Sequence, residues 1–112
     1  MEVLNQTKVD SLAREIGEEN VPVLVEIFLG ELDMYQQNLS SDQLDDKVQY
    51  LKEISHALKS SAASFGAELL CAKAVEIDSR AKSGEGIDEA HDTASMIELL
   101  ERTHQRYSQL AC

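Results

Sequence analysis

Residues 45–66 read DDKVQYLKEISHALKSSAASFG, and their apolar positions repeat with the spacing of an α-helix. One side of this helix, extended back by one residue, carries the apolar side chains of Leu44, Val48, Leu51, Leu58, Ala62 and Phe65. At about 100° per residue, His56 falls about 140° from Leu51, well outside that stripe. Gly66 is typical of a residue that ends a helix. The segment therefore predicts a helix over about 45–65 that packs along one side and carries His56 on its exposed side.

Four further segments show helical periodicity, with turns at Ser40–Asp42 and Ser83–Gly86 between the long ones. No segment shows the alternation of a strand. Helices joined by short connections become antiparallel neighbours. We therefore predict an all-α fold, with one domain spanning residues 1–112. It is an antiparallel up-down-up-down four-helix bundle (about 20–39, 45–65, 67–83 and 88–110) with an additional short N-terminal helix (about 7–16).

The inner faces of these helices follow from the same periodicity. Asn20 is expected to cap the second helix, with Pro22 in its first turn. The residues expected to face inward, outside the 45–65 helix, are Val9, Leu12, Ile16, Leu24, Phe28, Leu32, Tyr35, Leu39, Leu70, Ala74, Ile77, Ala81, Ala90, Ile97, Leu100 and Tyr107.

Composition excludes several classes of function. The net charge of −11 argues against nucleic acid as a partner. No apolar run approaches the roughly 20 residues that span a bilayer, so no membrane role is expected. Cys71 and Cys112 do not form a disulfide framework, and residues 1–10 do not resemble a signal peptide, so a cytoplasmic location is predicted. A monomer is expected because no helix shows a large unused apolar face.

Net positive charge is confined to one part of the chain. Residues 47–82 carry six basic and four acidic groups, whereas the segments on either side are strongly acidic. This basic segment contains His56. One interpretation is a docking face for an acidic partner, and the other is a chance fluctuation in surface charge.

The residues around His56 suit a phosphoryl acceptor. Ser60 at i+4 and Ala63 at i+7 are too small to cover the imidazole. An exposed imidazole is mostly neutral near pH 7 and can act as a nucleophile. Lys59 and Ser60 could support the phosphoryl oxygens. From geometry alone, an ordinary surface histidine fits equally well.

The order of residues after His56 resembles the phosphate-accepting signature of histidine phosphotransfer (HPt) domains. That signature has an apolar residue two positions later, lysine three later, usually glycine four later, then small residues, an apolar residue and glycine ten later. Ser60 replaces the usual glycine. Four stretches, the last of which contains this signature, resemble the LuxU-type HPt proteins of quorum sensing: Glu15–Gly17, Asn20–Leu24, Ile27–Glu31 and Tyr50–Ala67.

The resemblance implies a phosphorelay intermediate with no ATP site of its own. His56 would take a phosphoryl group from the receiver domain of a hybrid sensor kinase and pass it to an aspartate of a sigma-54-type response regulator. No cofactor of its own is expected, and Mg²⁺ would come from the receiver domain. The expected docking residues are Gln49, Lys52, Ala63 and Ser64.

Two alternatives come from other classes of protein. Glu53-x-x-His56 and Glu101-x-x-His104 match the Glu-x-x-His element of di-iron bundles, with Glu31 and Glu76 as further carboxylates. Glu53 and His56 are predicted to face outward, which opposes a metal site. The other alternative is a helical adaptor that carries no phosphate. His104 is expected to be half-buried, His91 solvated and Cys71 in the core.

Overall fold

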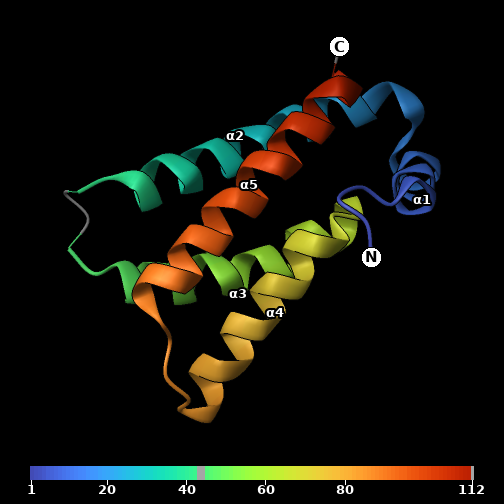
Figure 1. Ribbon diagram of the computed structural model, residues 1–112. Coiled ribbons are helices and arrows are strands. Elements are labelled where there is room, and N and C mark those ends of the chain that lie inside the picture. The colour runs from blue at the N-terminus through green and yellow to red at the C-terminus, as the bar shows by residue number, and fades with distance from the viewer. Residues whose placement is uncertain (43–44, 112) are drawn as a thin grey trace.

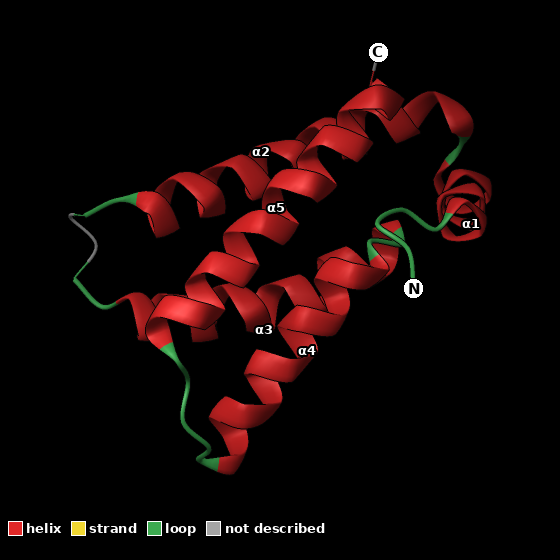
Figure 2. Ribbon diagram, viewed as in Figure 1, coloured by secondary structure: helices red, strands yellow, loops and turns green. Residues whose placement is uncertain are grey.

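The computed structural model describes residues 1–42 and 45–111 of the protein, and within them the chain is helical without strands (Figures 1 and 2). The elements are α1 (Gln6–Ile16), a 3-10 turn (Glu18–Asn20), α2 (Val21–Ser40), α3 (Lys47–Phe65), α4 (Glu68–Ser83) and α5 (Glu89–Ala111). Each predicted helix is present, with its ends within two residues of the predicted ones. None of the helices in the described residues is long and apolar enough to cross a membrane.

The four long helices form the predicted bundle. In Figure 1, α2 runs beside α5 and α3 runs beside α4, and these are the most extensive pairings in the fold. The short α1 lies across the end of the bundle where α3 finishes and contacts α3 and α2. This arrangement leaves one side of α3 in solvent and sets another side against α4.

An aromatic cluster ties three of the helices together. Phe28 of α2 stacks on Phe65 of α3 with ring centroids 4.4 Å apart, and Tyr107 of α5 meets Phe28 edge-on at 5.3 Å. The Tyr107 hydroxyl donates a hydrogen bond to the Phe65 carbonyl oxygen at 2.6 Å. Burial raises the pKa of this phenol, so it stays protonated as a donor. The cluster fixes the end of α3 beyond the exposed histidine.

The predicted inner faces are mostly confirmed, with one error on α5. Ala90 is exposed, and Met96 is fully buried in its place. Ala90 lies about 120° around the helix from Met96, so it cannot share the face that Met96, Leu100 and Tyr107 bury. Val25 and Ile54 are also buried and were not predicted. Leu44 and Cys112 lie outside the described residues.

The ends of α3 are fixed by local hydrogen bonds. Asp46 caps its start, accepting from the Gln49 backbone N–H at 3.0 Å. Gly66 ends it in the left-handed conformation, φ 77°. A Cβ on Gly66 would come within 2.7 Å of Lys8 Cβ and 2.8 Å of the Asn5 carbonyl oxygen. Glycine is therefore required for both the turn and the close approach of the N-terminal segment.

Asn20 occupies the N-cap position of α2, as predicted, but its side chain makes no capping hydrogen bond there. Its backbone is helical, φ −92° and ψ −14°, because it completes the 3-10 turn before α2. Capping bonds from a side chain normally need an extended backbone at that residue. The Asn20 amide instead donates to the Ile16 carbonyl oxygen at 2.7 Å and satisfies the end of α1. Pro22 does lie in the first turn of α2.

One face of α2 is apolar and exposed. Val23, Ile27 and Met34 are 58%, 64% and 51% exposed, and Gly30 completes the i, i+4, i+7, i+11 spacing. The monomer prediction rested on the absence of such a face, and that premise is wrong for α2. The oligomeric state itself stays a prediction.

Candidate functional site

His56 projects from the exposed side of α3, as its position in the sequence predicts. Its side chain is 68% exposed. Ser60, Ala63 and Ser64 are also exposed on this helix, so small residues surround the imidazole. The ring is therefore open to a partner protein.

A buried carboxylate on α4 anchors the imidazole. His56 Nδ1 lies 3.3 Å from Asp78 Oδ1, and the Asp78 side chain is only 8% exposed. An ionised carboxylate only accepts hydrogen bonds, so the ring proton is assigned to Nδ1. The lone pair of Nε2 is then directed away from Asp78.

Two lysines share the second oxygen of the same carboxylate. Lys59 Nζ lies 2.6 Å from Asp78 Oδ2, and Lys82 Nζ lies 2.9 Å from it. Their hydrogen bonds, that of Lys59 first, hold the pKa of Asp78 well below its usual range. Asp78 in turn raises the pKa of Lys59. The site is a cluster of one carboxylate and two lysines beside the imidazole.

The residues predicted to support the phosphoryl group differ in placement. Ser60 is exposed one turn after His56. Lys59, three residues after His56, is paired with Asp78. Ser61, the next hydroxyl, donates to Glu31 Oε1 at 2.9 Å and is turned towards α2.

The predicted docking residues all lie on α3. Ala63 and Ser64 are exposed, and the Ser64 hydroxyl donates to the Ser60 carbonyl oxygen at 3.1 Å. Gln49 is exposed and donates to Glu53 Oε1 at 3.4 Å, and Lys52 is half-buried. Together they follow the exposed side of α3 on both sides of His56. Their role in docking stays a prediction.

The sequence analysis missed Asp78 and Lys82. A signal was present, because Asp78 stands four residues after Ala74 and three before Ala81, on the predicted inner stripe of its helix. A carboxylate on an inner stripe must find cationic or hydrogen-bonding partners. Lys82 at i+4 is one such partner. What the sequence could not supply is the pairing of α4 with α3 that brings His56 and Lys59 to the same carboxylate.

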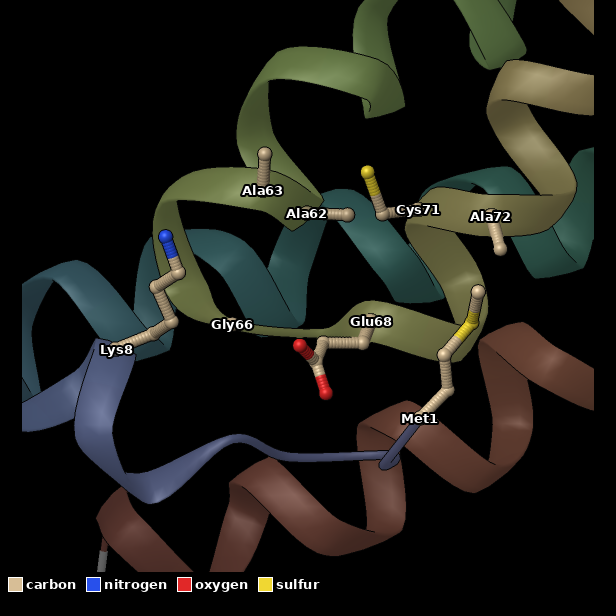
Figure 3. Close-up of a pocket in the computed structure, with 8 residues that line it drawn as sticks. All are labelled: Met1, Lys8, Ala62, Ala63, Gly66, Glu68, Cys71 and Ala72. Atoms are coloured by element: carbon tan, nitrogen blue, oxygen red, sulfur yellow. The ribbon is translucent and has the colours of Figure 1, made fainter.

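Two hollows lie near this part of α3. One, of about 540 Å³, runs along the cluster and is lined by Lys59, Val75, Asp78, Ser79, Lys82 and Ser83. The other, of about 290 Å³, lies between the N-terminal segment, the end of α3 and the start of α4 (Figure 3). Figure 3 shows Lys8, Glu68 and Cys71 around it, and His56 does not line it. Cys71 is partly exposed there rather than fully buried.

The di-iron alternative lacks the required geometry. Glu53 and Glu101 are exposed, like His56, and His104 is half-buried. Glu31 accepts from Ser61, and Glu76 pairs with Lys73 at 3.0 Å. Within residues 1–42 and 45–111, no three His, Cys, Asp or Glu side chains are grouped to hold a metal ion.

The chain is similar to known proteins over nearly its whole length. Residues 23–110 match the family model described as Hpt domain. The phosphorelay protein LuxU of Vibrio cholerae is 68% identical over 109 residues, covering 97% of this chain and 96% of the relative. LuxU of Vibrio vulnificus is 59% identical over 107 residues, covering 96% and 93%. LuxU of Vibrio harveyi is 51% identical over 106 residues, covering 95% and 93%.

A solved structure supports the fold. The crystal structure of histidine-containing phosphotransfer protein B from Pseudomonas aeruginosa superposes with a TM-score of 0.79, covering 97% of this chain and 94% of that one. At 22% identity, this similarity shows the fold alone. Family and relatives agree on a phosphotransfer intermediate rather than a classical enzyme. The chain belongs to the Hpt domain family and, within it, to the LuxU-type phosphorelay proteins of quorum sensing.

Proposed function

We propose that His56 accepts the phosphoryl group, taking it from a phosphorylated aspartate on the receiver domain of a hybrid sensor kinase. It then passes the group to an aspartate on a response regulator of the sigma-54 activator type. One observation carries the proposal: His56 is an exposed imidazole whose Nδ1 faces a buried, ionised carboxylate. The other histidines differ, since His91 lies near the start of α5 and His104 is half-buried.

The geometry favours transfer at Nε2. With the proton held on Nδ1, the Nε2 lone pair attacks phosphorus in line. An N–P bond forms as the bond from phosphorus to the partner's carboxylate oxygen breaks, and that oxygen keeps the electron pair. The ring becomes positively charged, and the ionised Asp78 carboxylate 3.3 Å away stabilises that charge. The reverse reaction returns the phosphoryl group to the next aspartate.

The remaining chemistry is divided between the two proteins. Ser60 offers a hydroxyl, and Lys59 contributes positive charge beside the phosphoryl group. The receiver domain supplies the Mg²⁺ and the acidic pocket, and the nucleotide is consumed upstream by the kinase. The docking surface is formed by Gln49, Lys52, Ala63 and Ser64, and the contact is expected to be small and transient.

The Cys71 thiol fits a reducing compartment such as the cytoplasm.

A helical adaptor is the second candidate, because α2 presents an exposed apolar face. Val23, Ile27 and Met34 are each more than half exposed, and apolar surface of this kind often marks a protein contact. An adaptor would use this face without any transfer at His56. The two functions therefore differ in whether the histidine is needed.

Phosphotransfer from a phosphorylated receiver domain tests the proposal, with one variant for each histidine. We expect acid-labile, base-stable label on the wild type and on His91→Ala and His104→Ala, and complete loss of label on His56→Ala. Circular dichroism should show that His56→Ala stays folded, because the side chain is exposed. Label on His56→Ala equal to that on the wild type would refute the assignment. A panel of receivers that leaves wild type unlabelled would favour the adaptor.

A further inference from the structure

The positive charge of the two lysines at Asp78 exceeds the single negative charge of its carboxylate. Asp78 Oδ2 accepts from both Lys59 and Lys82, while Oδ1 faces the imidazole. One lysine is enough to neutralise a single carboxylate. The second lysine can therefore bind another anion if its separation from Asp78 costs little free energy.

The two lysines differ in how easily they can leave. Lys59 makes the shorter contact, 2.6 Å against 2.9 Å, and its side chain is 32% exposed. The Lys82 side chain is 62% exposed and reaches Asp78 from one turn further along the same helix. Only the lysine of this i,i+4 pair lies mostly in solvent, so Lys82 can leave at a smaller cost than Lys59. Loss of Lys59 would instead leave the buried carboxylate without its closest cation.

A phosphoryl group on His56 would offer Lys82 a second anionic partner. It brings a charge of about −1.5 to −2 and three strong acceptor oxygens to the imidazole whose Nδ1 contacts the same carboxylate. Lys82 is a compact charge on a flexible four-carbon stem, which suits re-pairing without rearrangement of the backbone. Lys82 also lines the hollow of about 540 Å³ beside Lys59, Val75 and Asp78, so its side chain is not packed in place.

We propose that Lys82 is a phosphoryl-binding residue, held by Asp78 before transfer and moved onto the phosphoryl oxygens of His56 after it. Lys59 stays with Asp78 and keeps the carboxylate neutralised. The inference rests on the proposed function of His56 and assigns the two lysines different tasks. Lys82 would therefore stabilise phosphorylated His56 even when no partner protein is bound.

The second ionisation of the phosphoryl group tests this assignment. The protein is phosphorylated with phosphoramidate or with a phosphorylated receiver domain, and the phosphohistidine signal is followed by ³¹P NMR as pH is varied. A nearby cation favours the dianion, so Lys82→Gln should raise the pKa of the phosphoryl group by roughly 0.5 unit or more above that of the wild type. The matched control is Lys47→Gln, which removes one positive charge from the start of α3, away from the hollow.

The outcomes separate this inference from the proposed function. A raised pKa in Lys82→Gln but not in Lys47→Gln supports it. Wild-type titration in Lys82→Gln, or an equal rise in both variants, overturns it and leaves the role of His56 intact. Absence of any phosphohistidine signal on the wild type with both donors, or its persistence in His56→Ala, would overturn the role of His56 and the inference together.

Discussion

Two buried aspartates, Asp78 on α4 and Asp92 on α5, each pair with two cationic side chains, and of the two only Asp78 also contacts a histidine side chain. Asp92 Oδ1 accepts from Arg80 at 2.8 Å and from Lys73 at 2.9 Å. Its other oxygen accepts from the Asp88 backbone N–H at 3.0 Å, at the start of α5. Asp92 therefore joins α4 to α5, just as Asp78 joins α4 to α3.

Exposure of the cations separates the two clusters. Lys73 and Arg80 are 11% and 23% exposed, whereas Lys59 and Lys82 are 32% and 62% exposed. A cation enclosed with its partner stays in place and stabilises the fold. A cation that is mostly in solvent can change partners. The ion pairs of Asp92 thus hold helices together, whereas one ion pair of Asp78 is proposed to break when His56 is phosphorylated.

The largest effect is expected on stability when the enclosed cluster is broken. Asp92→Asn leaves Lys73 and Arg80 beside a neutral amide, and removal of one member of a buried ion pair costs about 3 kcal/mol or more. Urea unfolding followed by circular dichroism measures this loss of unfolding free energy. Phosphotransfer per folded molecule should stay at the wild-type level. A variant as stable as the wild type would show that the cluster contributes no net stability.

Acid provides a smaller perturbation of the same carboxylate. Burial alone would raise the pKa of Asp92, but hydrogen bonds from Arg80 and Lys73 outweigh it and hold the pKa at about 2. In the unfolded chain the pKa is about 3.9. Because the pKa of Asp92 is lower in the folded protein than in the unfolded chain, its ionised carboxylate stabilises the fold fully above about pH 5. This stabilisation is lost as pH falls towards 2. It amounts to about 2 kcal/mol.

Urea unfolding between pH 7 and pH 2 tests this dependence. The stability gap between the wild type and Asp92→Asn should narrow as pH falls through this window. Asp78 also has a lowered pKa, and it affects both proteins alike. Parallel stability profiles over the window would contradict the pKa assigned to Asp92.

The fold was more accessible from the sequence than the site was. Helix ends followed from local signals, such as the glycine at position 66, and inner faces followed from periodicity, with Ala90 misplaced. The exposure of His56 followed from its angle to Leu51. The partners of His56 did not, because they depend on which helices pair across the bundle. Asp78 stood on a predicted inner stripe, but nothing local indicated that Lys59 and His56 would meet it.

The smallest effect is expected at the Asp78 cluster, whose lysines are the more exposed, and it should fall mainly on the rate of phosphotransfer. Asp78→Asn keeps the shape of the side chain but removes the charge that stabilises the positively charged ring, so we expect the rate of phosphotransfer to fall about tenfold, or about 1.4 kcal/mol in activation free energy. Asp92→Asn is the matched control, since the same chemical change on the enclosed cluster should leave this rate unchanged. Imidazole ¹⁵N shifts of His56 provide a readout that a purely structural role would not alter. In the wild type they should report the proton on Nδ1, and in Asp78→Asn a mixture of the two tautomers. An unchanged rate together with unchanged shifts would mean that Asp78, like Asp92, only holds helices together.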